Sequence, residues 1–442
     1  MLKQSIISIR KGGNNMHELT KLIKEGMVPA LGVTEPGAIA FCVAKARSLI
    51  GGELKHLNVA LNSGMYKNAF TCGIPNSDEV GNLFAAALGY VAGDANKGLE
   101  ALAGVTPGDN AAAKSYIDAG LITVELNGMS SQIFIEAQLE TTEGSAVVTI
   151  RDSHTHITRI AVNGKVIFEA KSEKKAESEA EAETHPIHRY TLAQILDYIH
   201  TVPVEEIEFV KEAYRVNLAL FHEGLESPRT TFARRLLAMN GGKVISDDEL
   251  RTASLLCNAA IEARVIGLDK PAMSITGSGS HGIIATLPLY AVCQINHLPE
   301  EKLWRATMLS YLICTYIKEY SGKLSAFCGC GIAAGLGMAV AVCYLKGGTL
   351  KQMEYVINNM VSSITGMICD GGNQGCTMKG VSACSAAFDS VAFALYDVHI
   401  DSIHGIIGKT PEETMRNIGL IASPGMVQTE KTIVEIEESK LV

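Results

Sequence analysis

The sequence lacks a long apolar run, a basic block and a secretory leader. No apolar stretch reaches the ~18 uninterrupted residues that a membrane-spanning helix needs. The net charge is −9 at pH 7 and lysine and arginine are not clustered, which argues against nucleic acid as a partner because such binding depends on neutralising phosphates. The first fifteen residues have neither the apolar core nor the cleavage site of a signal peptide, so we expect a cytoplasmic protein that contacts no membrane.

Other familiar signals are also missing. We find no internal repeat, and "GSGSHG" is only a loose version of the dinucleotide-binding G-x-G-x-x-G motif, without its strand and helix. The 11 cysteines are odd in number, and in a long chain without a leader they do not indicate a disulfide framework. The 42 glycines, in contrast, indicate many tight turns and close backbone approaches.

The chain divides into two parts of different character. Residues 171–186, "KSEKKAESEAEAETHP", are charged, lack large apolar side chains and end in proline, which predicts a linker. Before it, residues 16–170 mix helical patterns with Val-, Ile- and Thr-rich strand patterns, the last of which form an antiparallel meander. After it, residues 187–442 consist of long apolar helical stretches. We therefore predict an α+β protein: an N-terminal mixed α/β domain with antiparallel strands and a large, mainly α-helical C-terminal domain.

The expected elements follow from these patterns. Strands are expected at residues 56–63, 121–128, 132–141, 145–153, 155–164 and 165–170. Helices are expected at residues 17–25, 36–49, 192–200, 205–222, 229–239, 247–265, 300–320, 331–345, 350–366 and 382–396.

Three cysteines stand in glycine-rich breaks between apolar stretches. Cys328 lies in "SAFCGCG", and Cys369 and Cys376 lie in "GMICDGGNQGCTMK". Zinc is one interpretation, although C-G-C is shorter than the C-x2-C spacing of many structural zinc sites. An iron–sulfur cluster with three protein ligands, which leaves one iron open to substrate, is another. The third is that all three are buried packing residues.

The stretch "ALGVTEPGAIAF" predicts a helix start. Glu35 precedes a proline, and Thr34 is the capping candidate. The simple interpretation is a capped helix. The functional one is a helix N-terminus that faces a substrate carboxylate.

The stretch "NSGMYKNAFTCG" follows a predicted strand. It brings together Ser63, Lys67 and Asn68, with Cys72 downstream. A solvated loop is one interpretation. A Lys/Asn pair that clamps a carboxylate is the functional alternative.

Two histidine-containing stretches complete the candidates. "SITGSGSHGIIATLPL" is a loop entering an apolar helix, where the amides around Ser278 and Gly279 can hold an anion and His281 can titrate near neutral pH. A structural role for His281 is the alternative. In "DSHTHI", His154 and His156 alternate along a predicted strand and face one side, either as a metal pair or as an exposed polar face.

Five stretches occur in a characteristic order: "ALGVTEP", "MYKN", "TGSGSHGIIATLP", "LSAFCGC" and "GMICDGGNQGCTMK". Together they resemble the L-cysteine desulfidase family (the UPF0597, YhaM-type proteins), which is related to the iron–sulfur L-serine dehydratases. The resemblance runs from about residue 16 to the C-terminus. It implies a lyase with a [4Fe-4S] cluster that converts a small amino acid, foremost L-cysteine, into pyruvate, sulfide and ammonia. An L-serine dehydratase-like activity is the alternative.

The resemblance also implies roles for individual residues. By motif match the cluster ligands are Cys328, Cys369 and Cys376, with Cys330 as the alternative to Cys328. Substrate would bind between the two domains. The implied substrate-binding residues are Thr34, Glu35, Ser63, Lys67, Asn68, Ser278 and Gly279.

Two motifs depart from the family pattern. The family's first motif reads Gly-Cys-Thr-Glu-Pro, with its cysteine as the proton acceptor, whereas this chain has Val33 there. "GSGSHG" replaces the "GSGNQG" of similar proteins. The general base is therefore unassigned, with Cys72, His281 and Lys67 as candidates. A non-catalytic amino-acid or redox sensor is the alternative function, and a homo-oligomer is left open.

Overall fold

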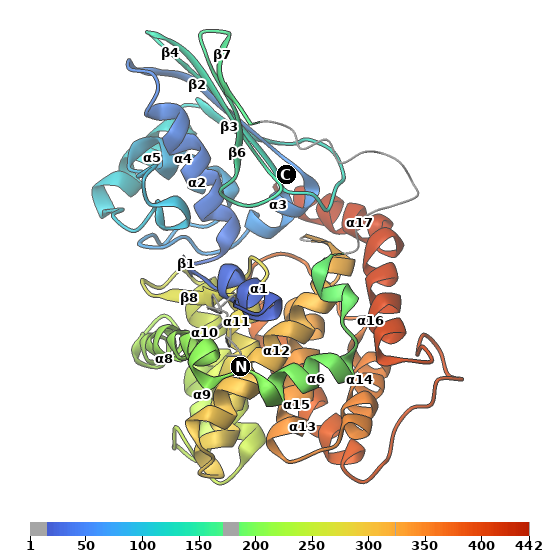
Figure 1. The fold of residues 1–442 in the computed structure, drawn as a ribbon. Coiled ribbons are helices and arrows are strands. Elements are labelled where there is room, and N and C mark those ends of the chain that lie inside the picture. Colours follow the sequence, from blue (N-terminus) through green and yellow to red (C-terminus); the bar gives the residue numbers. More distant parts are fainter. Residues whose placement is uncertain (1–15, 171–184, 323, 442) are drawn as a thin grey trace, which may run out of the picture.

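The computed structural model describes residues 16–170, 185–322 and 324–441 (Figure 1). A sheet with helices on one face lies over a larger body of helices, as Figure 1 shows. The predicted α+β class is therefore confirmed. Most of the predicted linker, residues 171–184, lies outside the described residues, and the short turn η2 (Pro186–Arg189) follows it. No helix in the described part of the chain is long and apolar enough to cross a membrane.

The main sheet has six strands in the order β3-β2-β4-β5-β6-β7. β2 pairs in parallel with β3, and the remaining pairs are antiparallel. The predicted meander is confirmed, because β4 to β7 pair in sequence order. The bounds are β2 (Leu54–Leu61), β3 (Ile122–Leu126), β4 (Phe134–Thr141), β5 (Gly144–Arg151), β6 (Ile157–Val162) and β7 (Lys165–Glu169).

Apolar side chains on one face of this sheet pack against helices. Leu57, Val59 and Leu61 alternate along β2 and are fully buried, as the two-residue period of a strand requires. Helix α2 packs against β4 and β5, and α4 packs against α2 and β3. The helices of this part of the chain are α2 (Thr34–Arg47), α3 (Ser63–Ala69), α4 (Asn82–Val91), η1 (Gly98–Glu100) and α5 (Pro107–Asp118).

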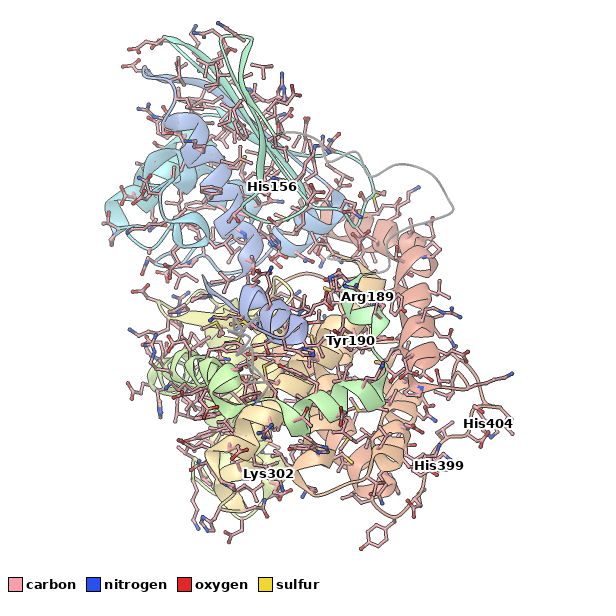
Figure 2. All side chains as sticks on the ribbon, viewed as in Figure 1. His156, Arg189, Tyr190, Lys302, His399 and His404 are labelled. Carbon is pink, nitrogen blue, oxygen red and sulfur yellow. The ribbon has the colours of Figure 1, made fainter. Side chains whose placement is uncertain are left out.

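The first helix, α1 (Glu18–Gly26), packs on the helical body instead of the sheet. Its Glu18 carboxylate accepts hydrogen bonds from Arg189 at 2.6 Å and from the Tyr190 hydroxyl at 3.0 Å, two residues labelled in Figure 2. Thr20 is within 2.7 Å of the Tyr198 hydroxyl. The N-terminal segment is therefore held to the C-terminal half of the chain.

The helical body is built around apolar helices. α13 is almost entirely buried and packs on α12 at close range, since a Cβ at Gly337 would lie 2.3 Å from the Ser310 carbonyl oxygen. The bounds are α6 (Leu192–Thr201), α7 (Val204–Ile207), η3 (Glu208–Val210), α8 (Lys211–Glu226), α9 (Phe232–Met239), α10 (Glu249–Val265), α11 (Gly279–Ile295), α12 (Glu300–Ser321), η4 (Cys330–Ala334), α13 (Gly335–Leu345), α14 (Leu350–Ile364), α15 (Gly375–Ala394), α16 (Pro411–Leu420), η5 (Ile421–Gly425), α17 (Val427–Glu438) and η6 (Ser439–Leu441).

Three features of this half differ from the prediction. Helix α15 begins at Gly375, ahead of the predicted start at residue 382. Helices α16 and α17 were not predicted. α17 runs from the helical body to α3 beside the sheet (Figure 1).

A two-stranded ladder connects the halves and was also not predicted. β1 (Val28–Leu31) pairs antiparallel with β8 (Pro271–Ser274), with Val28 opposite Ser274 and Leu31 opposite Pro271. β1 leads into the start of α2, and β8 leads into the glycine loop before α11. The ladder therefore brings the two predicted substrate-side loops next to each other.

Candidate active site

A cavity of about 860 Å³ lies beside the β1–β8 ladder. Both halves of the chain contribute side chains to its wall. Its polar, ionisable and thiol groups include Glu35, Asn68, His154, His281, Lys318, Cys330 and Cys369.

The two cysteine-bearing segments are joined by backbone hydrogen bonds. The Cys328 amide donates to the Met367 carbonyl at 3.0 Å, and the Cys369 amide donates to the Ala326 carbonyl at 2.7 Å. Phe327 and Ile368 form the antiparallel bridge between these bonds. The segments 326–328 and 367–369 therefore run side by side, which brings Cys328 close to Cys369.

Cys328 and Cys369, with Cys330 and Cys376 that follow them in the chain, influence one another electrostatically. Burial, followed by the charge of Cys330, raises the pKa of Cys376 to about 12. A hydrogen bond with Cys330 raises the pKa of Cys328, and Cys369 and Cys376 add to that rise. The same hydrogen bond lowers the pKa of Cys330, which opens onto the cavity. Cys328, Cys369 and Cys376 are thus brought together, with Cys330 among them.

Local contacts fix two of these thiols. The Gly331 amide donates to Cys328 Sγ at 3.4 Å, and Cys376 Sγ donates to the Gly371 carbonyl at 3.5 Å. Gly371 has a φ of +97°, where a side chain would be strained. Among the described residues, no three His, Cys, Asp or Glu side chains are grouped tightly enough to hold a single metal ion.

The start of α2 faces the cavity through Glu35. Glu35 Oε1 accepts from Asn68 Nδ2 at 2.9 Å, and the Asn68 Oδ1 accepts from the Cys369 thiol at 3.8 Å. The predicted helix start is confirmed, but Thr34 does not cap it. Val33 is the N-cap residue without a side-chain bond, and Thr34 Oγ1 accepts from buried Arg264 at 3.3 Å.

The stretch around Lys67 is a buried helix, α3, and not a solvated loop. Lys67 Nζ donates to the Ser325 and Cys369 carbonyls, each at 3.0 Å, and lies 3.1 Å from Glu430 Oε2. Ser63 Oγ donates to the other oxygen of Glu430 at 3.0 Å. Ser63 and Lys67 are therefore bound to α17 and do not line the cavity.

The surroundings of Lys67, Cys72 and His281 differ in ways that affect whether each can act as the general base. Burial opposes the charge of Lys67, yet the neighbouring Cys369 and Glu430 raise its pKa, so this ammonium keeps its proton near neutral pH. Burial raises the pKa of Cys72, whose thiol donates to the Ala69 carbonyl away from the cavity. Of the three candidates, His281 alone lines the cavity.

The glycine loop positions His281 against the cysteine bend. His281 Nδ1 is 2.6 Å from Thr276 Oγ1, and a Cβ at Gly329 would lie 2.6 Å from its Nε2. Ser278 is the N-cap residue of α11 and lines the cavity. Gly279 allows buried Arg264 to approach, since a Cβ there would lie 2.6 Å from Arg264 Nε.

His154 is a cavity residue that the sequence pattern did not identify as one. It lies in the turn after β5, where strand alternation does not apply, and its Nε2 is 3.9 Å from Glu35 Oε1. His156 is half exposed and pairs with Asp152 at 3.8 Å (Figure 2). The two histidines therefore do not form the metal pair considered above. The signal that could have identified His154 is its position in a turn that joins two strands at the end of the sheet facing the cavity.

Comparison with known proteins identifies the family of this chain. Residues 96–435 match the family model described as serine dehydratase alpha chain. The chain is 41% identical over 433 residues to a UPF0597 protein of Clostridium botulinum strain Langeland, covering 96% of this chain and 99% of that protein. UPF0597 proteins of Caldanaerobacter subterraneus and Alkaliphilus oremlandii are 36% and 34% identical, each covering 95% of this chain and 97% of their own.

The match to the serine dehydratase alpha chain over residues 96–435 defines a serine dehydratase-like protein. The chain belongs to the UPF0597 family within that class.

Proposed function

We propose that this protein is an iron–sulfur-dependent lyase that removes the β-substituent of a small amino acid, with L-cysteine as the preferred substrate. The observation that carries the proposal is that Cys330 and Cys369 line the same cavity as Glu35 and His281. Thiol groups and acid–base side chains thereby face one cavity. Such a combination suits an elimination, which needs both a stabilised leaving group and proton transfer.

The thiols fit a cluster better than a single ion. Thiolates that hold an iron–sulfur cluster each bind a different iron, so they stand farther apart than the ligands of one ion. Cys328, Cys369 and Cys376 would hold a [4Fe-4S] cluster, with Cys330 in place of Cys328 as the second arrangement. When bound, a cluster with one iron free of protein ligands supplies a Lewis acid for the leaving group or the carboxylate.

Substrate binding would use groups from both halves. The amides at the start of the 17-residue helix α11, with Ser278 and Gly279, would receive the substrate carboxylate, because a helix N-terminus favours negative charge. The Glu35 carboxylate would receive its ammonium group. Asn68 and His154 both approach Oε1 of Glu35, which within the described part of the chain leaves Oε2 for this contact.

The reaction balances without an external oxidant or reductant. The Cα proton passes to a base, the C–H bonding pair forms the Cα=Cβ bond, and the β-substituent leaves with the pair of its bond to Cβ. The aminoacrylate product tautomerises to an imine, which water hydrolyses to pyruvate and ammonium. For L-cysteine the leaving group is sulfide.

Two alternatives remain within this family and site. L-Serine would react in the same way with hydroxide as the leaving group. A non-catalytic amino-acid or redox sensor is favoured by Val33, which is 2% exposed, packs against Gly372 and cannot accept a proton. A cytoplasmic location and a homo-oligomer remain predictions.

The test is anaerobic purification with iron and sulfide analysis, followed by a screen of L-cysteine, L-serine and their D-isomers for 2-oxo acid. We expect bound iron and sulfide in similar amounts and release of pyruvate from L-cysteine. Chelation of the iron should abolish that release. Bound cluster with ligand-dependent stabilisation but no product would indicate the sensor. Zinc, or protein without metal after anaerobic reconstitution, would contradict the cluster.

A further inference from the structure

The turn after β5 gives the cavity a second buried histidine. His154 is 8% exposed and lines the cavity on the wall supplied by the sheet. Its Nε2 lies 3.9 Å from Glu35 Oε1. We infer that His154, beside the Glu35 carboxylate, is the general base that takes the Cα proton of the substrate. This inference rests on the proposed function.

The position of His281 makes it less suited to that role. Its Nδ1 is held by Thr276, and its Nε2 lies against the cysteine bend, where a Cβ at Gly329 would come within 2.6 Å of it. His281 therefore lies on the side where the β-substituent would leave. His154 belongs to the other half of the chain and lies beside the start of α2. An elimination places its base and its leaving-group site at different positions around the substrate, and the two histidines meet that requirement.

Glu35 supplies what an imidazole base needs. A carboxylate beside a histidine stabilises, through its charge, the imidazolium that forms when the proton is taken. Asn68 holds the Glu35 carboxylate at 2.9 Å, and both Glu35 and His154 are buried, which strengthens their interaction relative to water. Glu35 is the positioning residue of this pair. Val33, one residue before the same helix, offers no competing base.

The proton transfer is simple to write. The unprotonated ring nitrogen of His154 accepts the Cα proton and leaves the bonding pair on Cα as a carbanion. That pair then forms the double bond as the β-substituent leaves with the electrons of its bond to Cβ. The imidazolium then returns its proton to product or water. With an amino acid that has no leaving group on Cβ, the same base exchanges the Cα proton with solvent and nothing else happens.

L-Alanine in D₂O therefore isolates this step. Exchange of its Cα proton is followed by NMR for the wild-type protein and for His154→Gln, with His156→Gln as the matched control two residues away. We expect the exchange rate to fall about 10²–10⁴-fold in His154→Gln and to stay unchanged in His156→Gln. Visible cluster absorbance should be equal in all three. Imidazole should partly restore exchange in His154→Ala, which separates loss of the base from loss of folding.

A second comparison uses Glu35→Gln and His281→Gln. Glu35→Gln should slow exchange by a smaller factor than His154→Gln, because the base remains but loses the negative charge beside it. Exchange that persists in His154→Gln, or that disappears in His281→Gln alone, would overturn the inference.

The outcomes also separate the inference from the proposed function. Wild-type exchange that depends on His154, without 2-oxo acid from any substrate, supports the base and refutes the lyase. Pyruvate release that is equal in His154→Gln and wild type supports the lyase and refutes the base. A wild-type protein that does neither refutes both.

Discussion

Gly282 lies directly against the backbone of Met273, so that a Cβ at residue 282 would come within 1.8 Å of the Met273 carbonyl oxygen. Met273 belongs to β8, whose ladder with β1 fixes the glycine loop of the cavity. The first turn of α11 can therefore approach the ladder only because residue 282 has no side chain.

Gly282→Ala should destabilise the protein by about 1–3 kcal/mol or more, since the contact is with backbone and cannot be relieved by a rotamer change. It should also weaken substrate binding through displacement of Ser278. Urea unfolding and KM measure the two effects. Gly366→Ala is the control, because no atom lies within 4 Å of its Cβ position. Equal stability of the two variants would contradict the packing argument.

The Lys67–Glu430 ion pair should be essential for docking α17 on α3. Removing one member leaves a buried charge without its partner, which costs about 3–5 kcal/mol. We expect Lys67→Met to lower the free energy of unfolding by that amount. The double variant Lys67→Met/Glu430→Gln should lower it by less, because no charge is left without a partner. Lys114→Met breaks an exposed pair with Asp118, which solvent screens, and should change stability far less. A similar cost for Lys67→Met and Lys114→Met in denaturant unfolding would refute this prediction.

The cysteine variants should identify the cluster ligands. Cys369→Ala and Cys376→Ala should lose iron and visible absorbance together after anaerobic purification. Of Cys328→Ala and Cys330→Ala, the variant that loses the cluster names the third ligand. Cys343→Ala, in the buried helix α13, should keep full iron content. Iron retained at the wild-type level in Cys369→Ala would remove that residue from the ligand set.

Glu437 should make the stability of the protein depend on pH. Burial raises its pKa to about 8 from an ordinary 4.5, although the charge of Lys67 opposes the rise. Between these values the folded state keeps a proton that the unfolded state has released. The stabilisation that this retained proton gives to the folded state is therefore fully present below pH 4.5, and it is lost as the pH rises through 8.

Glu437→Gln carries no titrating group and should remove this decline. The free energy of unfolding, measured across this pH range, should therefore change less with pH in the variant than in the wild type. The exposed Glu435→Gln is the control. Parallel profiles for Glu437→Gln and wild type would show that Glu437 does not titrate in this range.

Local pattern predicted most of the regular structure but not the contacts between its halves. The strands of the meander were predictable because their apolar residues alternate and turn residues separate them. β1 and β8 were not, because each has four residues, each contains a proline, and they pair only with each other. The start of α15 was missed because its glycines favour a break. There Gly380 packs against Asn258 of α10, where a Cβ would lie 2.0 Å from Oδ1.

The same limit applies to the candidate site. Motif order pointed to Glu35, Asn68, Ser278, His281 and the cysteines, all of which lie at or beside the cavity. Lys67 was assigned to substrate because its counter-ion, Glu430, lies in a helix that the sequence pattern did not reveal. His154 was assigned to a strand, and a residue in a turn points wherever the turn directs it.

The pairing of Lys67 with Glu430 also has a consequence for biosynthesis. The two residues are 363 positions apart in the chain. A ribosome therefore exposes the ammonium long before its counter-ion. The sheet and its helices are synthesised well ahead of α17, so α3 acquires its ionic partner only after that distant helix has emerged.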